Sequence, residues 1–138
     1  MKLIAILVFL MPLAAVGQTA DSYQQTMEKF KTFFNAGQGD SINAMYGHEW
    51  DEMKLTKALW TDAKADELLK EYGKLKSFKF IGIDKDDPNK VYVFQTIFGK
   101  KRDNLTSLTL DPENKLSVFR LTTSSDEITR LLKSSQNK

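Results

Sequence analysis

Apolar side chains near the start of the chain recur at the spacing of an α-helix. Successive members of this stripe are separated mainly by three or four residues, which places them on one helical face. The stripe consists of Tyr23, Met27, Phe30, Phe33 and Phe34. Two glycines within 35–39 are expected to end this first helix.

Two further helical segments are predicted before the middle of the chain. Asp40-Ser41 is a suitable cap for a short helix that carries apolar residues up to position 46. Residues 55–72 favour helix, with Thr56 or Thr61 as the N-cap and the glycine that follows as the C-terminal stop. The pattern leaves open whether 55–72 form one helix or two.

Beyond residue 77, the helical spacing gives way to alternating apolar and polar positions separated by turn residues. Four strands are predicted, at 78–83, 91–98, 105–110 and 116–122. The strand at 91–98 carries apolar side chains at both odd and even positions. We therefore expect it to be a central strand with both faces covered.

The C-terminus is predicted to form a short helix. Residues 124–127 resemble a capping box, and Ile128, Leu131 and Leu132 follow before a polar tail at 134–138. Helices followed by a strand meander predict an α+β fold, in which N-terminal helices pack on a curved four-stranded antiparallel meander sheet. The sheet is expected to curl around the first helix and to leave room for a concave pocket.

The first residues of the chain are typical of an export signal. Lys2 precedes 14 apolar residues, and small residues then predict cleavage between Gly17 and Gln18. The run is shorter than the roughly 20 residues that a membrane-spanning helix needs, which favours a cleaved signal over an anchor. We therefore expect residues 1–17 to be a signal peptide and 18–138 to be a single secreted or periplasmic domain.

Composition narrows the classes of partner. The chain has no cysteine, so disulfides and lipid attachment through cysteine are excluded. Its 20 basic and 18 acidic residues become 19 and 18 once Lys2 is removed, a net charge of +1. A domain this close to neutral is a poor binder of phosphate backbones, and we expect no nucleic-acid partner.

Several short motifs, at 30–40, 53–55, 71–76, 108–111 and 115–116, stand within the predicted order of helices followed by strands. In these motifs and this order the chain resembles the nuclear transport factor 2-like superfamily. The chain is most similar to an exported bacterial domain of unknown function, often found beside or fused to penicillin-binding-type serine hydrolases. The resemblance implies a cone-shaped domain with a pocket at its wide end. None of the matching residues is catalytic, so it implies no hydrolase activity.

A single histidine lies in the one cluster that combines donor, base and acid. His48 stands between Tyr46 and Asp51, and enzymes of the superfamily place such residues in the cone. We expect the segment to be a loop, where these side chains usually face water, so a catalytic role is the weaker interpretation. No zinc motif is present, and the acidic residues at 84–89 fit a hairpin turn better than a calcium loop. No metal or cofactor is predicted.

Aromatic side chains are the remaining signal for function. Most of the nine Phe, four Tyr and two Trp are expected in the core. The candidates for lining a ligand pocket are Tyr46, Trp50, Trp60, Tyr72, Tyr92 and Phe94. These residues, too, lie in a core more often than they line a ligand site.

The sequence favours a non-catalytic binding or accessory domain that takes a small apolar ligand or an envelope protein partner. The main alternative is a small isomerase or hydratase that uses His48 and Asp51, with Tyr46 as a further candidate. A structural or assembly module is a third interpretation. A homodimer through the exposed sheet face is compatible with the first and the third.

Overall fold

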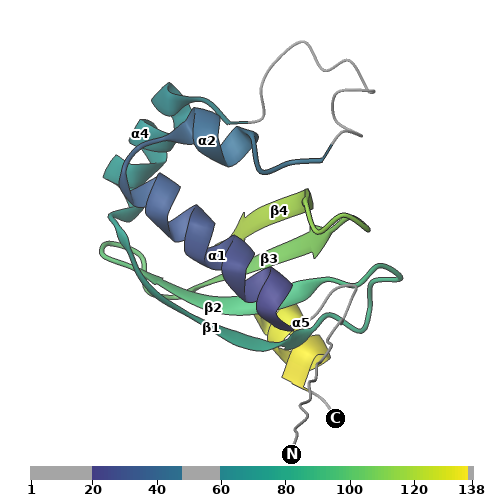
Figure 1. The fold of residues 1–138 in the computed structure, drawn as a ribbon. Helices are drawn as coiled ribbons and strands as arrows, with labels where there is room; N and C mark the ends of the chain where they lie inside the picture. Colours follow the sequence, from purple (N-terminus) through teal and green to yellow (C-terminus); the bar gives the residue numbers. More distant parts are fainter. Residues whose placement is uncertain (1–19, 48–59, 137–138) are drawn as a thin grey trace, which may run out of the picture.

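The computed structural model describes residues 20–47 and 60–136 and shows an α+β fold (Figure 1). The helices are α1 (Ala20–Asn35), α2 (Gly39–Asn43), α4 (Asp62–Tyr72) and α5 (Ser125–Gln136). The strands are β1 (Leu75–Ile83), β2 (Tyr92–Phe98), β3 (Asn104–Leu110) and β4 (Leu116–Thr122). They form one open antiparallel sheet in the order β1-β2-β3-β4, so the predicted meander is confirmed.

Helix α1 lies across one face of the sheet, which is called the inner face below (Figure 1). Its apolar stripe is fully buried at Met27, Phe30 and Phe34, which confirms the helical spacing of these positions. On the sheet side, cross-strand neighbours such as Tyr92 and Leu108 point toward the helix. Burial of these large side chains is the main favourable term in the stability of the fold.

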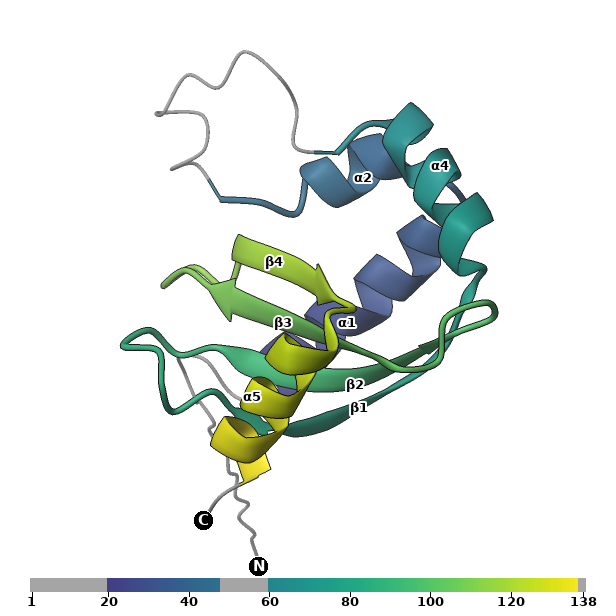
Figure 2. The ribbon, with the colours of Figure 1, turned by 180° about the vertical axis from the view of Figure 1, so that it is seen from behind.

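Helix α5 packs on the opposite, outer face of the sheet (Figure 2). Leu131 of this helix is buried against Val93 and Leu105 from β2 and β3. Strand β2 is therefore covered on both faces, by α1 and by α5, as its apolar pattern predicted.

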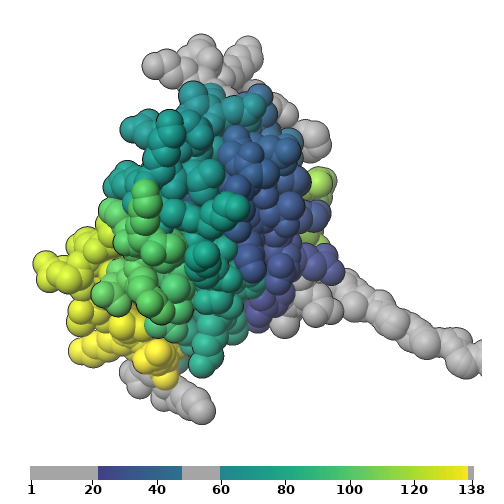
Figure 3. Space-filling view, turned by 90° about the vertical axis from the view of Figure 1, so that its left-hand side faces the viewer, coloured from purple at the N-terminus to yellow at the C-terminus, as the bar shows by residue number. Residues whose placement is uncertain are grey.

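The helical layer is tied to the β2–β3 hairpin at one end of the sheet (Figure 3). The Lys100 amide and side chain donate hydrogen bonds of 2.7 Å to the carbonyls of Tyr72 and Lys70. These carbonyls belong to the last turn of α4, where no amide of the helix itself is left to donate to them. The hairpin thus fixes the C-terminal end of α4 against the sheet.

Helix α5 is longer than the sequence pattern predicted. Ser134 and Ser135 were expected in a polar tail, but they are buried in the last turns of the helix. The Ser134 hydroxyl donates to Asp84 at 2.6 Å and accepts from the Lys85 amide at 2.7 Å. The Ser135 hydroxyl donates to the Leu131 carbonyl within the helix. The polar tail was the wrong prediction because the partners of Ser134 lie in the β1–β2 connection, far away in sequence.

The acidic β1–β2 connection is a hairpin turn, as predicted, and its first carboxylate anchors α5. Asp84 is 4 % exposed and accepts a 3.0 Å ion-pair hydrogen bond from Arg130. Arg130 also pairs with Asp86 at 3.1 Å and with Glu127 at 2.7 Å. A buried carboxylate with several donors holds the helix to the turn more firmly than an exposed ion pair would.

We expect Asp84→Asn to destabilise the protein by about 2 kcal/mol at pH 7 and by less in acid. Burial raises the pKa of Asp84, but hydrogen bonds from Arg130, Ser134 and the Asp86 amide lower it further than burial raises it. A lowered folded-state pKa stabilises the fold above the unfolded value of about 3.9, and this contribution disappears as pH falls through the folded pKa.

The measurement is urea unfolding of both proteins between pH 7 and pH 2. Glu113→Gln, which removes an exposed carboxylate from the β3–β4 turn, is the control and should cost less at pH 7. If Asp84→Asn lowered the free energy of unfolding by the same amount at every pH, the lowered pKa of Asp84 in the folded state would be contradicted.

The starts of β1 and α2 differ from the sequence prediction, and side chains distant in sequence contact both; α2 also ends at Asn43, before Met45 and Tyr46. Strand β1 begins at Leu75 rather than at residue 78. The Asn35 side chain accepts a 2.7 Å hydrogen bond from the Leu75 amide and donates one of 3.0 Å to the Leu75 carbonyl. Helix α2 begins at Gly39 with Gln38 as N-cap and has no side-chain cap, so the predicted Asp40-Ser41 cap is wrong. The Asp40 amide instead donates to the Asp62 carboxylate at 2.9 Å.

The boundaries of α4 agree with the predicted signals. The Thr61 hydroxyl accepts from the Lys64 amide at 3.1 Å as the N-cap, and Gly73 is the C-cap. Of the two threonines considered, Thr61 is therefore the cap of this helix. Residues 55–59, which include Thr56, lie outside the described residues.

Candidate functional site

A pocket of about 320 Å³ lies between α4 and the inner face of β4. Most of its wall is aromatic or aliphatic, and we call it the aromatic pocket. The described residues that line it are Tyr46, Trp60, Lys64, Leu68, Tyr72, Phe119 and Leu121. Its volume is at the lower end of the range of about 300–1,000 Å³ that is usual for small-molecule sites.

Trp60 forms the wall between the pocket and the core. Its ring meets the rings of Phe30 and Phe119 edge to face, at 5.8 and 6.3 Å between centroids. Its amide donates a 3.2 Å hydrogen bond to the Asn43 side chain at the end of α2. Because both ring and backbone are held, this indole is a rigid surface for a ligand.

Tyr46 enters the pocket from a short extended segment beside β4. This segment pairs with Leu116 through the Gly47 amide, at 3.0 Å, and the Met45 carbonyl, at 2.9 Å. Burial raises the pKa of the Tyr46 phenol, while a hydrogen bond from the Trp60 indole, which can only donate, lowers it. The pKa remains above its usual value, so the phenol is protonated at neutral pH.

Tyr72 closes the pocket at the end of α4. Its ring contacts Phe98 edge to face at 5.1 Å between centroids, and the Lys101 ammonium lies 4.7 Å from the ring centre. Lys101 also pairs with Glu71 at 3.0 Å. A second ammonium, that of Lys64, lies 5.3 Å from the Trp60 ring. Cations are thus arranged over the aromatic rings at this end of the molecule.

The structure brings three of the predicted ligand-binding residues together and places two elsewhere. Tyr46, Trp60 and Tyr72 line one pocket although they are up to 26 positions apart in sequence. Tyr92 and Phe94, at 1 % and 0 % exposure, are buried in the core against Tyr23 of α1. The other candidates, His48, Trp50 and Asp51, lie outside the described residues.

Four of the lining residues were not predicted, although their spacing in the sequence groups them: Lys64, Leu68, Phe119 and Leu121. Lys64, Leu68 and Tyr72 follow one another at four-residue intervals, so they share one face of α4, and Trp60 directly precedes its N-cap. Phe119 and Leu121 are two positions apart on a strand and therefore share its inner face. Only the folded arrangement shows that these two faces meet.

None of the helices in the described part of the chain combines the length and apolar character needed to cross a bilayer. Comparison of the chain with protein families, with curated proteins and with solved structures gives no match. The superfamily resemblance inferred from the sequence therefore stays a prediction.

Proposed function

We propose that this chain is an exported, non-catalytic binding domain whose aromatic pocket takes a small, neutral, apolar molecule. The observation that carries the proposal is the set of rings and aliphatic side chains in the pocket wall, held in place by the core beneath it. Apolar walls of this kind bind ligands by removing apolar surface from water.

The chemistry of the pocket wall favours binding over catalysis. Among the described residues that line it, none carries a carboxylate, an imidazole or a thiol. Tyr46 belongs to the catalytic candidates, but its raised pKa makes it a poor general base at neutral pH. The described wall therefore supplies contact surface and no obvious proton acceptor.

Export and the cone-shaped fold belong to the same proposal. The apolar run at the start of the chain supports secretion or a periplasmic location. Helices packed on one face of an open sheet, with a pocket between helix and sheet, are compatible with a nuclear transport factor 2-like cone. In such a domain a soluble ligand would reach the pocket from the aqueous phase outside the cytoplasm.

A fluorescence titration tests the proposed ligand class. Trp50→Phe leaves Trp60 as the only tryptophan, so its emission reports on the pocket wall. Titration with the neutral probe N-phenyl-1-naphthylamine is expected to quench this emission to saturation and to raise the emission of the probe. No change in either signal at the solubility limit of the probe would contradict the proposal.

A pair of substitutions on β4 tests whether the probe binds in the aromatic pocket. Leu121→Asn, on the inner face, should weaken probe binding about tenfold or more, because an apolar wall residue is lost. Val118→Asn, on the outer face of the same strand and 36 % exposed, should leave it unchanged. Equal effects of the two substitutions would show that the probe binds elsewhere.

A further inference from the structure

A second pocket, of about 340 Å³, lies between α1, α2 and the β3–β4 turn. Its lining includes the apolar side chains of Phe33, Met45 and Leu116 together with the polar ones of Thr26, Ser41 and Asn114. Lys29 from α1 and Lys115 from the β3–β4 turn also line the pocket. We call it the basic pocket.

The basic pocket is separate from the aromatic pocket. Met45 lines the basic pocket, whereas its neighbour Tyr46 lines the aromatic pocket. The stretch that carries both residues is hydrogen-bonded to Leu116 through the Met45 carbonyl and the Gly47 amide, and it lies between the two pockets. An occupant of one pocket would thus contact a different set of side chains from an occupant of the other.

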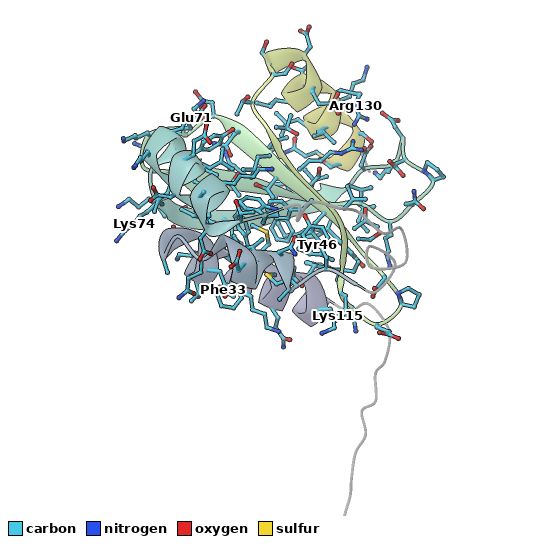
Figure 4. All side chains as sticks on the ribbon, turned by 90° about the horizontal axis from the view of Figure 1, so that it is seen from above. Phe33, Tyr46, Glu71, Lys74, Lys115 and Arg130 are labelled. Atoms are coloured by element: carbon cyan, nitrogen blue, oxygen red, sulfur yellow. The ribbon has the colours of Figure 1, made fainter. Side chains whose placement is uncertain are left out.

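The charged residues among the described lining of the basic pocket are both lysines. Lys29 and Lys115 are both exposed, and no acidic residue is among the described residues that line the pocket. In the described part of the chain, neither ammonium takes part in an ion pair. Figure 4 shows Lys115 and Phe33 along one side of the molecule, with the ion-paired Arg130 on the far side.

We propose that the basic pocket binds a small amphipathic carboxylate. Its hydrocarbon chain lies on Phe33, Met45 and Leu116, and its carboxylate is held by Lys29 and Lys115. Chain burial supplies most of the affinity, and the two ammonium groups select an anion over an alcohol of the same length.

The size and charge of the site favour a free carboxylate over a membrane surface. A pocket of this volume encloses one short chain, and only two lysines border it. Stable attachment to a bilayer usually needs a larger basic cluster or a second anchor. The ligand is therefore a soluble carboxylate that enters the pocket singly.

Calorimetric titration of the purified chain with decanoate, below its micelle concentration, tests this site. Saturable binding is expected, with decanol binding about tenfold more weakly. Lys29→Gln combined with Lys115→Gln should weaken decanoate binding about tenfold, since each exposed pair contributes up to about 1 kcal/mol. Lys31→Gln combined with Lys79→Gln removes the same charge from outside the pocket and should leave binding unchanged.

Carbon-13 methyl spectra identify the pocket that is occupied. Decanoate should shift the Met45 methyl signal, while the methyl signals of Leu68 and Leu121 in the aromatic pocket stay in place. Equal affinity for decanol, equal loss in both double variants, or shifts confined to Leu68 and Leu121 would each overturn the proposal. So would binding to phosphatidylglycerol vesicles without binding of soluble decanoate.

Discussion

Replacement of Phe30 by alanine should lower the free energy of unfolding by about 3–5 kcal/mol. Phe30 is completely buried, and its ring lies 4.4 Å from that of Phe119 and 5.3 Å from that of Phe34, between centroids. It also contacts Trp60 at 5.8 Å. Truncation would leave a cavity directly beneath two walls of the aromatic pocket, and the large cost follows from both lost contacts and empty space.

Urea unfolding of the wild type and the variant measures this cost. Phe33→Ala is the control, because this neighbouring ring is only partly buried at the edge of the core and should cost clearly less. A cost for Phe30→Ala no larger than that for Phe33→Ala would show that the stripe of α1 is not packed as described.

Gly39→Ala should destabilise the protein by about 3 kcal/mol. Helix α2 begins at Gly39, and a Cβ there would overlap the Thr61 carbonyl group at the start of α4. The neighbouring atom is backbone, so relief requires a shift of α2 away from α4. Such a shift would also move Trp60, because Trp60 directly precedes Thr61 and its amide is hydrogen-bonded to the Asn43 side chain of α2.

Gly37→Ala is the matched control, because it adds the same methyl group two residues earlier. Gly37 has a φ of 69°, and a Cβ there would meet nothing within 4 Å. Its expected cost is the backbone strain alone, about 1–2 kcal/mol. Thermal unfolding of both variants gives the comparison, and a larger loss for Gly37→Ala would contradict the close packing of α2 on α4.

Most of the fold follows from local periodicity in the sequence. The spacing of Met27, Phe30 and Phe34 identifies α1 and its buried face, and the apolar residues of both parities in β2 identify a central strand. These patterns are visible because each depends only on neighbouring positions. The four strands and their meander order were predictable for the same reason.

The features that escaped prediction depend on partners distant in sequence. Asp84 pairs with Arg130, 46 positions away, and accepts from the Ser134 hydroxyl, 50 positions away, and these contacts hold α5 through its last turns. Asn35 sets the first residue of β1 from 40 positions away. No local pattern distinguishes these side chains from solvated ones, so a polar tail and a later strand start were reasonable expectations.

The candidate site was predictable in part. Tyr46, Trp60 and Tyr72 stood out as aromatic residues near the helices, and the structure groups them in one pocket. Tyr92 and Phe94 have the same chemical character but belong to the strand that α1 covers, so they form core. Residue type alone does not separate these two outcomes; the position of the strand in the sheet does.

The most direct test of the central proposal is a set of nuclear Overhauser contacts between the bound probe and the protein. With N-phenyl-1-naphthylamine at saturation, we expect cross-peaks from its rings to the methyl groups of Leu68 and Leu121 and to the indole of Trp60. Cross-peaks only to residues outside the aromatic pocket, or none to the protein at all, would contradict the account.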